Sequence, residues 1–120
     1  MKRVYVAGAY SADNILQVLT NMRRGMKVAK DVLLAGYAPF TPWHDFHHTL
    51  MLDPGEELFV HCYHDFSLAW LEVSDAMILV PGYENSKGTA VEIARAKELG
   101  IPVFNNLEEL NQWANPIEKD

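Results

Sequence analysis

Residues 75–104, DAMILVPGYENSKGTAVEIARAKELGIPVF, decide the fold of this chain. The run AMILV is apolar throughout, as expected of a strand that is buried on both faces of a sheet. A helix is expected from Ser86 to Leu99, with Gly100 ending it, and IPVF is expected to form the next strand. Because a strand, a helix and a strand follow one another, the two strands are predicted to be parallel and joined by a right-handed crossover.

The rest of the chain continues this alternation of strands and helices. Residues 41–55 show no clean period and contain two prolines, so a long surface loop is expected there. The remaining predicted elements are strands at 3–8 and 37–40 and helices at 14–35, 56–73 and 106–114. Together they predict an α/β fold, a flavodoxin- or Rossmann-like three-layer sandwich with a four- to five-stranded parallel sheet. The length suits a single domain spanning residues 1–120.

The composition narrows the classes of partner and compartment. The chain has 10 Lys and Arg residues and 16 Asp and Glu residues, and its formal net charge is -6. This balance argues against a nucleic acid polymer as partner, because binding a phosphate backbone requires a basic face. Cys62 is the single cysteine, so no internal disulfide can form and a reducing compartment is expected. The apolar runs are too short for a signal peptide or a membrane span, so we expect a cytoplasmic protein without membrane contact.

Three segments are expected to meet at the carboxyl edge of the sheet, where α/β proteins bind ligands. The first follows the first strand and has the sequence AGAYSADN, which does not match the dinucleotide fingerprint GxGxxG. Gly8 permits a close approach of the backbone, and Tyr10 and Ser11 offer polar groups at the end of the strand. The alternative is a simple turn followed by a helix cap at Asp13 or Asn14. The other two segments are the 41–55 loop and residues 81–88.

The segment ENSKGTAVE begins the helix that follows the third strand. The N–H groups at Ser86 and Gly88 and the helix dipole favour an anion at this position. Glu92 lies one to two turns further, with its side chain directed back toward the helix N-terminus. A phosphate held by the N–H groups would leave an attached sugar within reach of the Glu92 carboxylate. The alternative is a solvated Glu92 paired with Arg95.

Histidines gather in the expected loop and in the helix after it. The five histidines are His44, His47, His48, His61 and His64. A metal centre is one interpretation, because histidine and aspartate bind zinc and similar ions. However, His61 and His64 do not form an HExxH pattern, and no cysteine pair accompanies them. The other interpretation places Trp43 and His44 in the wall of a pocket for a planar ring, and we expect neither a metal nor a cofactor.

The chain resembles the nucleoside 2-deoxyribosyltransferase-like superfamily over about residues 3 to 110. This superfamily includes deoxynucleoside 5′-monophosphate N-glycosidases and many short phage and bacterial members. The resemblance is carried by VYVAGAYS, by GYAPFTP and above all by LAWLEVSDAMILVPGYENSKGTAVEIARAKELGIPVF. The last of these combines a strand, a Pro-Gly-aromatic loop, a Ser-x-Gly motif and a glutamate on the following helix.

The resemblance implies roles for the residues at these motifs. In the superfamily, the glutamate at the position of Glu92 attacks C1′ of the sugar and forms a glycosyl-enzyme ester. Ser86 and Gly88 would hold the 5′-phosphate or the sugar, and Tyr5 or Tyr10 would lie near the nucleophile. The further residues expected around the ligand are Gly8, Ser11, Trp43 and His44.

Two departures from the family pattern concern the acid and the phosphate. Family members commonly have an aspartate eight residues before the acidic residue that precedes the third strand, where it helps to protonate the leaving base. Counting back from Asp75, that position is Ser67, and a serine is not a comparable proton source. Asp65 is the predicted substitute, although it lies about 200° around an ideal helix from Ser67; a loop histidine and weak turnover are the alternatives. Phosphate-binding relatives carry an arginine near the position of Ser11, so both nucleosides and nucleotides stay candidate substrates.

The resemblance implies an enzyme that cleaves, or transfers across, the N-glycosidic bond of a (deoxy)nucleoside or its 5′-monophosphate, with Glu92 as nucleophile. Its partner would be a small-molecule nucleoside or nucleotide, and a homodimer or larger homo-oligomer is expected. One alternative is a non-catalytic nucleotide-binding or sensing module on the same fold, which Ser67 favours. The other is a metal hydrolase that uses the histidines.

Overall fold

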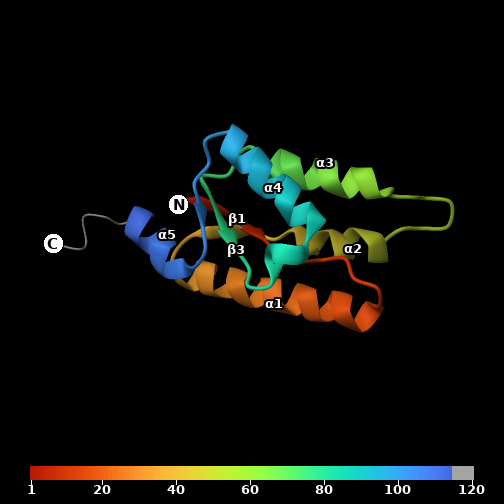
Figure 1. The fold of residues 1–120 in the computed structure, drawn as a ribbon. Helices are drawn as coiled ribbons and strands as arrows, with labels where there is room; N and C mark the ends of the chain where they lie inside the picture. Colours follow the sequence, from red (N-terminus) through yellow and green to blue (C-terminus); the bar gives the residue numbers. More distant parts are fainter. Residues whose placement is uncertain (115–120) are drawn as a thin grey trace.

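Four parallel strands form the middle layer of a three-layer α/β sandwich in the computed structural model, which describes residues 1–114 (Figure 1). The strands are β1 (Arg3–Ala7), β2 (Ala38–Phe40), β3 (Ala76–Leu79) and β4 (Val103–Phe104). They lie in the order β2-β1-β3-β4, and every adjacent pair is parallel. The predicted fold class is confirmed, with four strands in the sheet.

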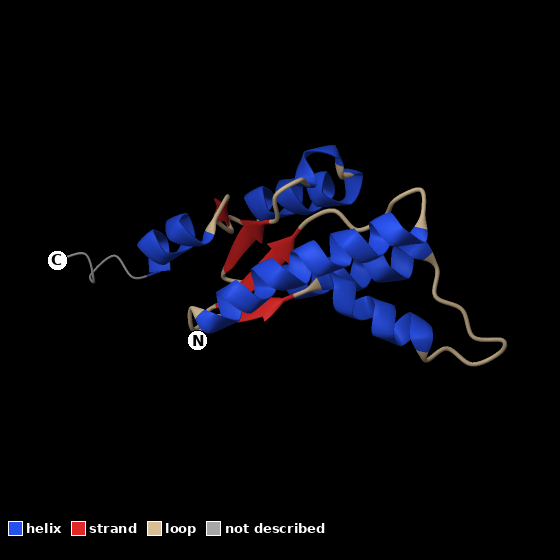
Figure 2. Ribbon diagram, turned by 90° about the horizontal axis from the view of Figure 1, so that it is seen from below, coloured by secondary structure: helices blue, strands red, loops and turns tan. Residues whose placement is uncertain are grey.

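Helices cover both faces of this sheet (Figures 1 and 2). Helices α1 and α5 lie on one face, and helices α3 and α4 lie on the other. The helical elements are α1 (Ile15–Leu34), α2 (Asp45–Leu50), α3 (Val60–Leu71), α4 (Lys87–Glu98), α5 (Leu107–Ala114) and two short 3-10 turns, η1 (Pro42–His44) and η2 (Tyr83–Asn85). Among the described helices, none is both long enough and apolar enough to cross a membrane.

The strand order places a crevice between β1 and β3. The chain moves outward from β1 to β2 through α1, then returns past β1 to form β3. Because the connections leave β1 and β3 in opposite directions, the segments after these two strands separate at their carboxyl ends. Open α/β sheets bind their ligands at this topological switch point.

Alternation along β1 gives each face of the sheet its own core. Val4 and Val6 belong to the core under α1 and α5, while Tyr5 and Ala7 belong to the core under α3 and α4. All four side chains are fully buried. Tyr5 therefore lies on the side of the sheet that faces α4.

Two glycines allow close packing around the crevice. A Cβ atom at Gly8 would lie 2.6 Å from the Cβ of Val80, which is too close for two carbon atoms. The close approach of the chain just after β1 to the chain just after β3 therefore requires a residue without a side chain at position 8. A Cβ atom at Gly25 would lie 2.4 Å from the ring of Trp43. The indole of Trp43 thus packs directly on the backbone of α1 and fixes η1 against that helix.

Residues 41–59 differ from the sequence prediction. Where a loop was expected over 41–55, η1 and the helix α2 form, because the buried Trp43 anchors this segment to α1. The following helix was expected from residue 56 but begins at Val60. The reason is a turn over residues 53–56, in which Gly55 has a φ of 92° and the N–H of Glu56 donates to the carbonyl of Asp53 at 3.0 Å.

Replacing Gly25 with alanine tests the anchor between Trp43 and α1. We expect Gly25→Ala to lower the free energy of unfolding by about 1–3 kcal/mol, because the new methyl group must displace a buried ring. Urea denaturation followed by circular dichroism measures this change. The matched control is Gly88→Ala in α4, where an added Cβ meets nothing within 4 Å and should stabilise the helix slightly. Equal stability of the two variants would contradict this account of the anchor.

Candidate active site

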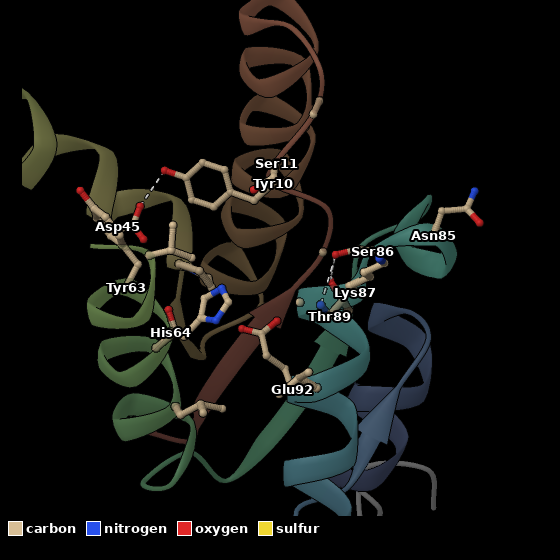
Figure 3. A pocket seen from close by; sticks show the side chains of 18 of the residues that line it. Tyr10, Ser11, Asp45, Tyr63, His64, Asn85, Ser86, Lys87, Thr89 and Glu92 are labelled. Carbon is tan, nitrogen blue, oxygen red and sulfur yellow. Dashed lines mark hydrogen bonds between the residues drawn. The ribbon is translucent and has the colours of Figure 1, made fainter. Parts of the chain in front are cut away.

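A cavity of about 900 Å³ lies at the carboxyl edge of the sheet, at the crevice between β1 and β3 (Figure 3). Its volume falls in the range typical of small-molecule sites. Three groups of elements line it: the segment after β1, helices α2 and α3, and the N-terminal half of α4. The cavity brings together seven of the residues expected from the sequence, namely Gly8, Tyr10, Ser11, Ser67, Ser86, Gly88 and Glu92.

Glu92 projects from α4 into this cavity (Figure 3). Its Oε2 accepts a hydrogen bond from the hydroxyl group of Tyr5 on β1. Burial raises the pKa of the Glu92 carboxyl group to about 7, and the bond from Tyr5 opposes this rise. Arg95, the alternative partner suggested by the sequence, pairs instead with Glu72 at 3.2 Å and Glu98 at 3.5 Å. Glu92 is therefore a carboxyl group held at a cavity wall and not a surface ion pair.

Tyr5 is held in place by aromatic packing below the cavity. Its ring stacks on Phe40 at a centroid distance of 5.3 Å, and Phe40 stacks on Trp70 at 5.7 Å. Burial and the charge of Glu92 raise the pKa of the Tyr5 hydroxyl group well above its usual value. Tyr5 thus stays protonated at neutral pH and acts as a fixed donor to Glu92.

The N-terminus of α4 forms a second wall of the cavity. Ser86 caps the helix, and its Oγ accepts hydrogen bonds from the backbone N–H of Thr89 at 3.2 Å and from the Thr89 hydroxyl at 2.9 Å. Lys87 and Gly88 follow in the first turn and also line the cavity. The first N–H groups of a helix have no acceptor within the helix, so this wall is suited to an anion.

Asp45 and Tyr10 form the opposite wall, and the sequence analysis did not identify Asp45. The Tyr10 hydroxyl group donates to Oδ1 of Asp45 at 2.6 Å (Figure 3). The carbonyl of Tyr10 accepts from Nδ2 of Asn21 at 3.1 Å, which ties this segment to α1. Burial raises the pKa of the Asp45 carboxyl group, against the opposing effects of Tyr10 and His48. The cavity therefore contains two carboxyl groups that are not exposed, the buried Asp45 on α2 and the partly buried Glu92 on α4.

Helix α3 turns Ser67 toward the cavity and Asp65 away from it. Ser67 is buried, whereas Asp65 is exposed and does not line the cavity. The expectation that Asp65 faces the ligand is thus not met, because residues two apart lie on opposite sides of a regular helix. The spacing could have shown this in the sequence: the cavity residues Val60, Tyr63, His64, Ser67 and Leu68 follow the i, i+3, i+4, i+7, i+8 pattern of one helical face.

Trp43 and His44 also lie elsewhere than expected. Trp43 is a buried core residue under α1, and its Nε1 donates to the carbonyl of Ala9 at 3.1 Å. His44 is exposed, and its Nδ1 pairs with the hydroxyl of Thr41. Neither lines the cavity, because the helical turn η1 points Trp43 inward and His44 outward. Within residues 1–114, no group of three or more His, Cys, Asp or Glu side chains is arranged to hold a metal ion.

Comparison with known proteins identifies a fold neighbour and a family. The structure is similar to that of a 2-deoxyribosyltransferase from the psychrotolerant bacterium Bacillus psychrosaccharolyticus, described as a biocatalyst for the synthesis of antiviral and antitumoral nucleosides. The match has a TM-score of 0.56 and 19% sequence identity, and it covers 84% of this chain and 69% of that chain. The family model "Domain of unknown function (DUF7768)" matches residues 2–106. No curated protein matches the chain in sequence.

The raised pKa of Glu92 makes the stability of the protein depend on pH. The folded state holds this proton up to a pH of about 7, whereas the unfolded chain releases it near 4.5. The proton therefore stabilises the fold below pH 4.5, and this contribution is lost as the pH rises through 7. Glu92→Gln has no such loss, so its stability relative to the parent protein should rise by about 1–3 kcal/mol between pH 5 and pH 8.

Urea denaturation of both proteins at the two pH values measures this difference. The matched control is Glu84→Gln, which removes an exposed carboxylate from the nearby η2 turn. A stability difference for Glu92→Gln that does not change with pH would mean that the Glu92 carboxyl group is not desolvated.

Proposed function

We propose that this chain, which belongs to the DUF7768 family and has the fold of a 2-deoxyribosyltransferase, cleaves the N-glycosidic bond of a (deoxy)nucleoside or its 5′-monophosphate. The observation that carries the proposal is the position of Glu92, a carboxyl group at the wall of a cavity of ligand size with Tyr5 as its fixed hydrogen-bond donor. The fold neighbour is a 2-deoxyribosyltransferase described as a biocatalyst for the synthesis of nucleosides, which is consistent with this chemistry.

Glu92 would act as the nucleophile in a two-step displacement. In the first step, an Oε atom of the ionised Glu92 forms a bond to C1′ of the sugar while the bond from C1′ to the base nitrogen breaks. In the second step, water attacks C1′ and releases the sugar from Glu92, with retention of the anomeric configuration. The Tyr5 hydroxyl orients the carboxylate and stabilises its ionised form, which is the reactive one.

The N-terminus of α4 would bind the end of the substrate remote from the base. Its first N–H groups and the ammonium group of Lys87 supply hydrogen bonds and positive charge for a 5′-phosphate or a 5′-hydroxyl group. Glu92 lies on the same helix, one to two turns further along. A sugar bound through its 5′ end would therefore place C1′ toward the nucleophile.

Hydrolysis is the favoured outcome over transfer to a second base. Val60 on α3 and Val91 on α4 line the cavity, and their side chains are 71% and 58% exposed. A cavity with such exposed walls admits water to the glycosyl-enzyme ester, whereas transfer requires that water be excluded.

Release of free base tests the proposed reaction. The purified protein would be incubated with a panel of deoxynucleosides, deoxynucleotides and ribonucleotides, and the products separated by chromatography. We expect the parent protein to release base from at least one of them and Glu92→Ala to be slower by about 10³-fold or more, because it lacks the nucleophile. Mass spectrometry of the quenched reaction should find the added sugar on the peptide that contains Glu92.

A nucleotide-binding module without catalysis is the second candidate, and Ser67 favours it. Ser67 lines the cavity at the position where the superfamily resemblance implies an acid, and a serine does not replace an acid. This candidate predicts that intact nucleotides raise the melting temperature of the protein while no base appears. Such a result with every member of the panel would overturn the glycosidase proposal.

The pH dependence of the reaction tests the role of Tyr5. Because Glu92 must be ionised to attack, kcat/KM should fall as the pH decreases through about 7. Tyr5→Phe removes a hydrogen bond that favours the carboxylate, so the midpoint should move upward by about one pH unit. The matched control is Tyr37→Phe, which alters a buried tyrosine under the other face of the sheet. A midpoint that stays unchanged in Tyr5→Phe would rule out this role.

A further inference from the structure

We propose that Asp45 is the acid that protonates the leaving base. The inference rests on the proposed glycosidase function and assigns a second catalytic residue to the same cavity. It places this acid on α2, whereas the sequence pattern led us to expect it on the helix that became α3.

The position of Asp45 suits this role. Asp45 is the first residue of α2 and lines the cavity, yet its side chain is only 5% exposed. Figure 3 shows it on the wall formed by α2, across the cavity from Glu92 on α4. A nucleophile and an acid must act at opposite sides of the bond that breaks, and these two carboxyl groups have that arrangement.

The hydrogen bond from Tyr10 determines which oxygen of Asp45 can carry the proton. Oδ1 accepts the Tyr10 hydroxyl at 2.6 Å, and no residue among 1–114 donates to Oδ2. A protonated Asp45 therefore keeps its bond with Tyr10 on Oδ1 and carries its proton on Oδ2. The hydrogen bond from Tyr10 thus fixes the orientation of the carboxyl group and leaves Oδ2 available to donate its proton to a ligand.

The surroundings of Asp45 favour its protonated form. Burial raises the pKa of this carboxyl group, while Tyr10 and the charge of His48 reduce that effect. The charge of Asp45 also makes a small contribution to the raised pKa of Tyr5, the donor to Glu92.

The other groups at the cavity are weaker candidates. Ser67 does not release a proton at neutral pH, and Asp65 faces away from the cavity. Asp13 lines the cavity but is exposed to solvent. His64 lines the cavity and is the remaining rival, yet it is exposed and no hydrogen bond within residues 1–114 holds its ring.

The reaction balances with Asp45 in this role. As the bond from C1′ to the base nitrogen breaks, its electron pair passes to the base, and the proton on Oδ2 moves to a base nitrogen. The products of this step are the neutral free base, the glycosyl ester of Glu92 and ionised Asp45. In the second step, the ionised Asp45 takes a proton from the attacking water, which restores both carboxyl groups to their starting state.

A pair of substrates that differ in their need for a proton tests the assignment. A purine nucleoside or nucleotide cleaved by the parent protein would be compared with its N7-methylated form, whose positively charged base leaves as a neutral molecule without protonation. We expect Asp45→Asn to be slower by about 10²–10⁴-fold on the ordinary substrate and to keep most of its activity on the methylated one. If the panel selects pyrimidines, uracil and 5-fluorouracil substrates form the pair, because 5-fluorouracil is the better leaving group.

Control variants separate the failure of this assignment from failure of the proposed function. Glu92→Ala should lose activity on both substrates, and a parent protein that cleaves neither would refute the glycosidase function itself. Tyr10→Phe keeps Asp45 but removes the hydrogen bond that orients it, so this variant should show the same selective loss to a smaller extent. If Asp45→Asn does not fold, Tyr10→Phe replaces it in the test. Equal losses on both substrates, no loss at all, or a selective loss in His64→Gln instead of Asp45→Asn would overturn the proposal.

Discussion

The hydrogen bond from Tyr5 to Glu92 joins the middle of the sheet to the helix that borders the cavity, and the site depends on it. Tyr5 can donate this bond only because alternation along β1 turns it toward α4 and because Phe40 and Trp70 stack beneath its ring. Glu92 can accept it only because α4 begins at Ser86 and presents Glu92 one to two turns later. The position of the carboxyl group is thus a consequence of strand register and helix capping.

Holding a carboxyl group in this position works against the stability of the fold. Burial destabilises the ionised form of Glu92, and the single bond from Tyr5 offsets part of that effect. The same holds for Asp45 and its bond from Tyr10. Two tyrosines from one segment of the chain, Tyr5 in β1 and Tyr10 just after it, therefore each orient one carboxyl group of the cavity. Carboxyl groups whose pKa is raised by burial cluster at functional sites, where the protein uses the group chemically.

The sequence predicted the parts of this structure that depend on local pattern. The apolar run at residues 76–80, a helix start at Asp13 or Asn14 (the structure has Asn14) and the position of Glu92 in the N-terminal half of α4 follow from neighbouring residues alone. The sequence-based prediction was wrong where the structure depends on a contact between residues far apart in the chain. Trp43 packs on Gly25, and η1 and α2 form where a loop was expected. This helix brings Asp45 to the cavity. The wrong prediction for Asp65 has another cause. The helical period of α3 already places Ser67 and Asp65 on opposite sides of the helix, so the sequence alone could have excluded Asp65.

The packing of Trp43 links the core to the chemistry proposed for Asp45. Trp43 lies two residues before Asp45, and its ring is held against α1 on the face of the sheet opposite to α4. Asp45 is thus positioned from one core of the protein, and Glu92 is positioned from the other. The cavity lies where elements from these two cores meet, at the end of the sheet at which strand order reverses. Because α2 and α3 both present side chains to this cavity, an acid on either helix would be compatible with the same fold.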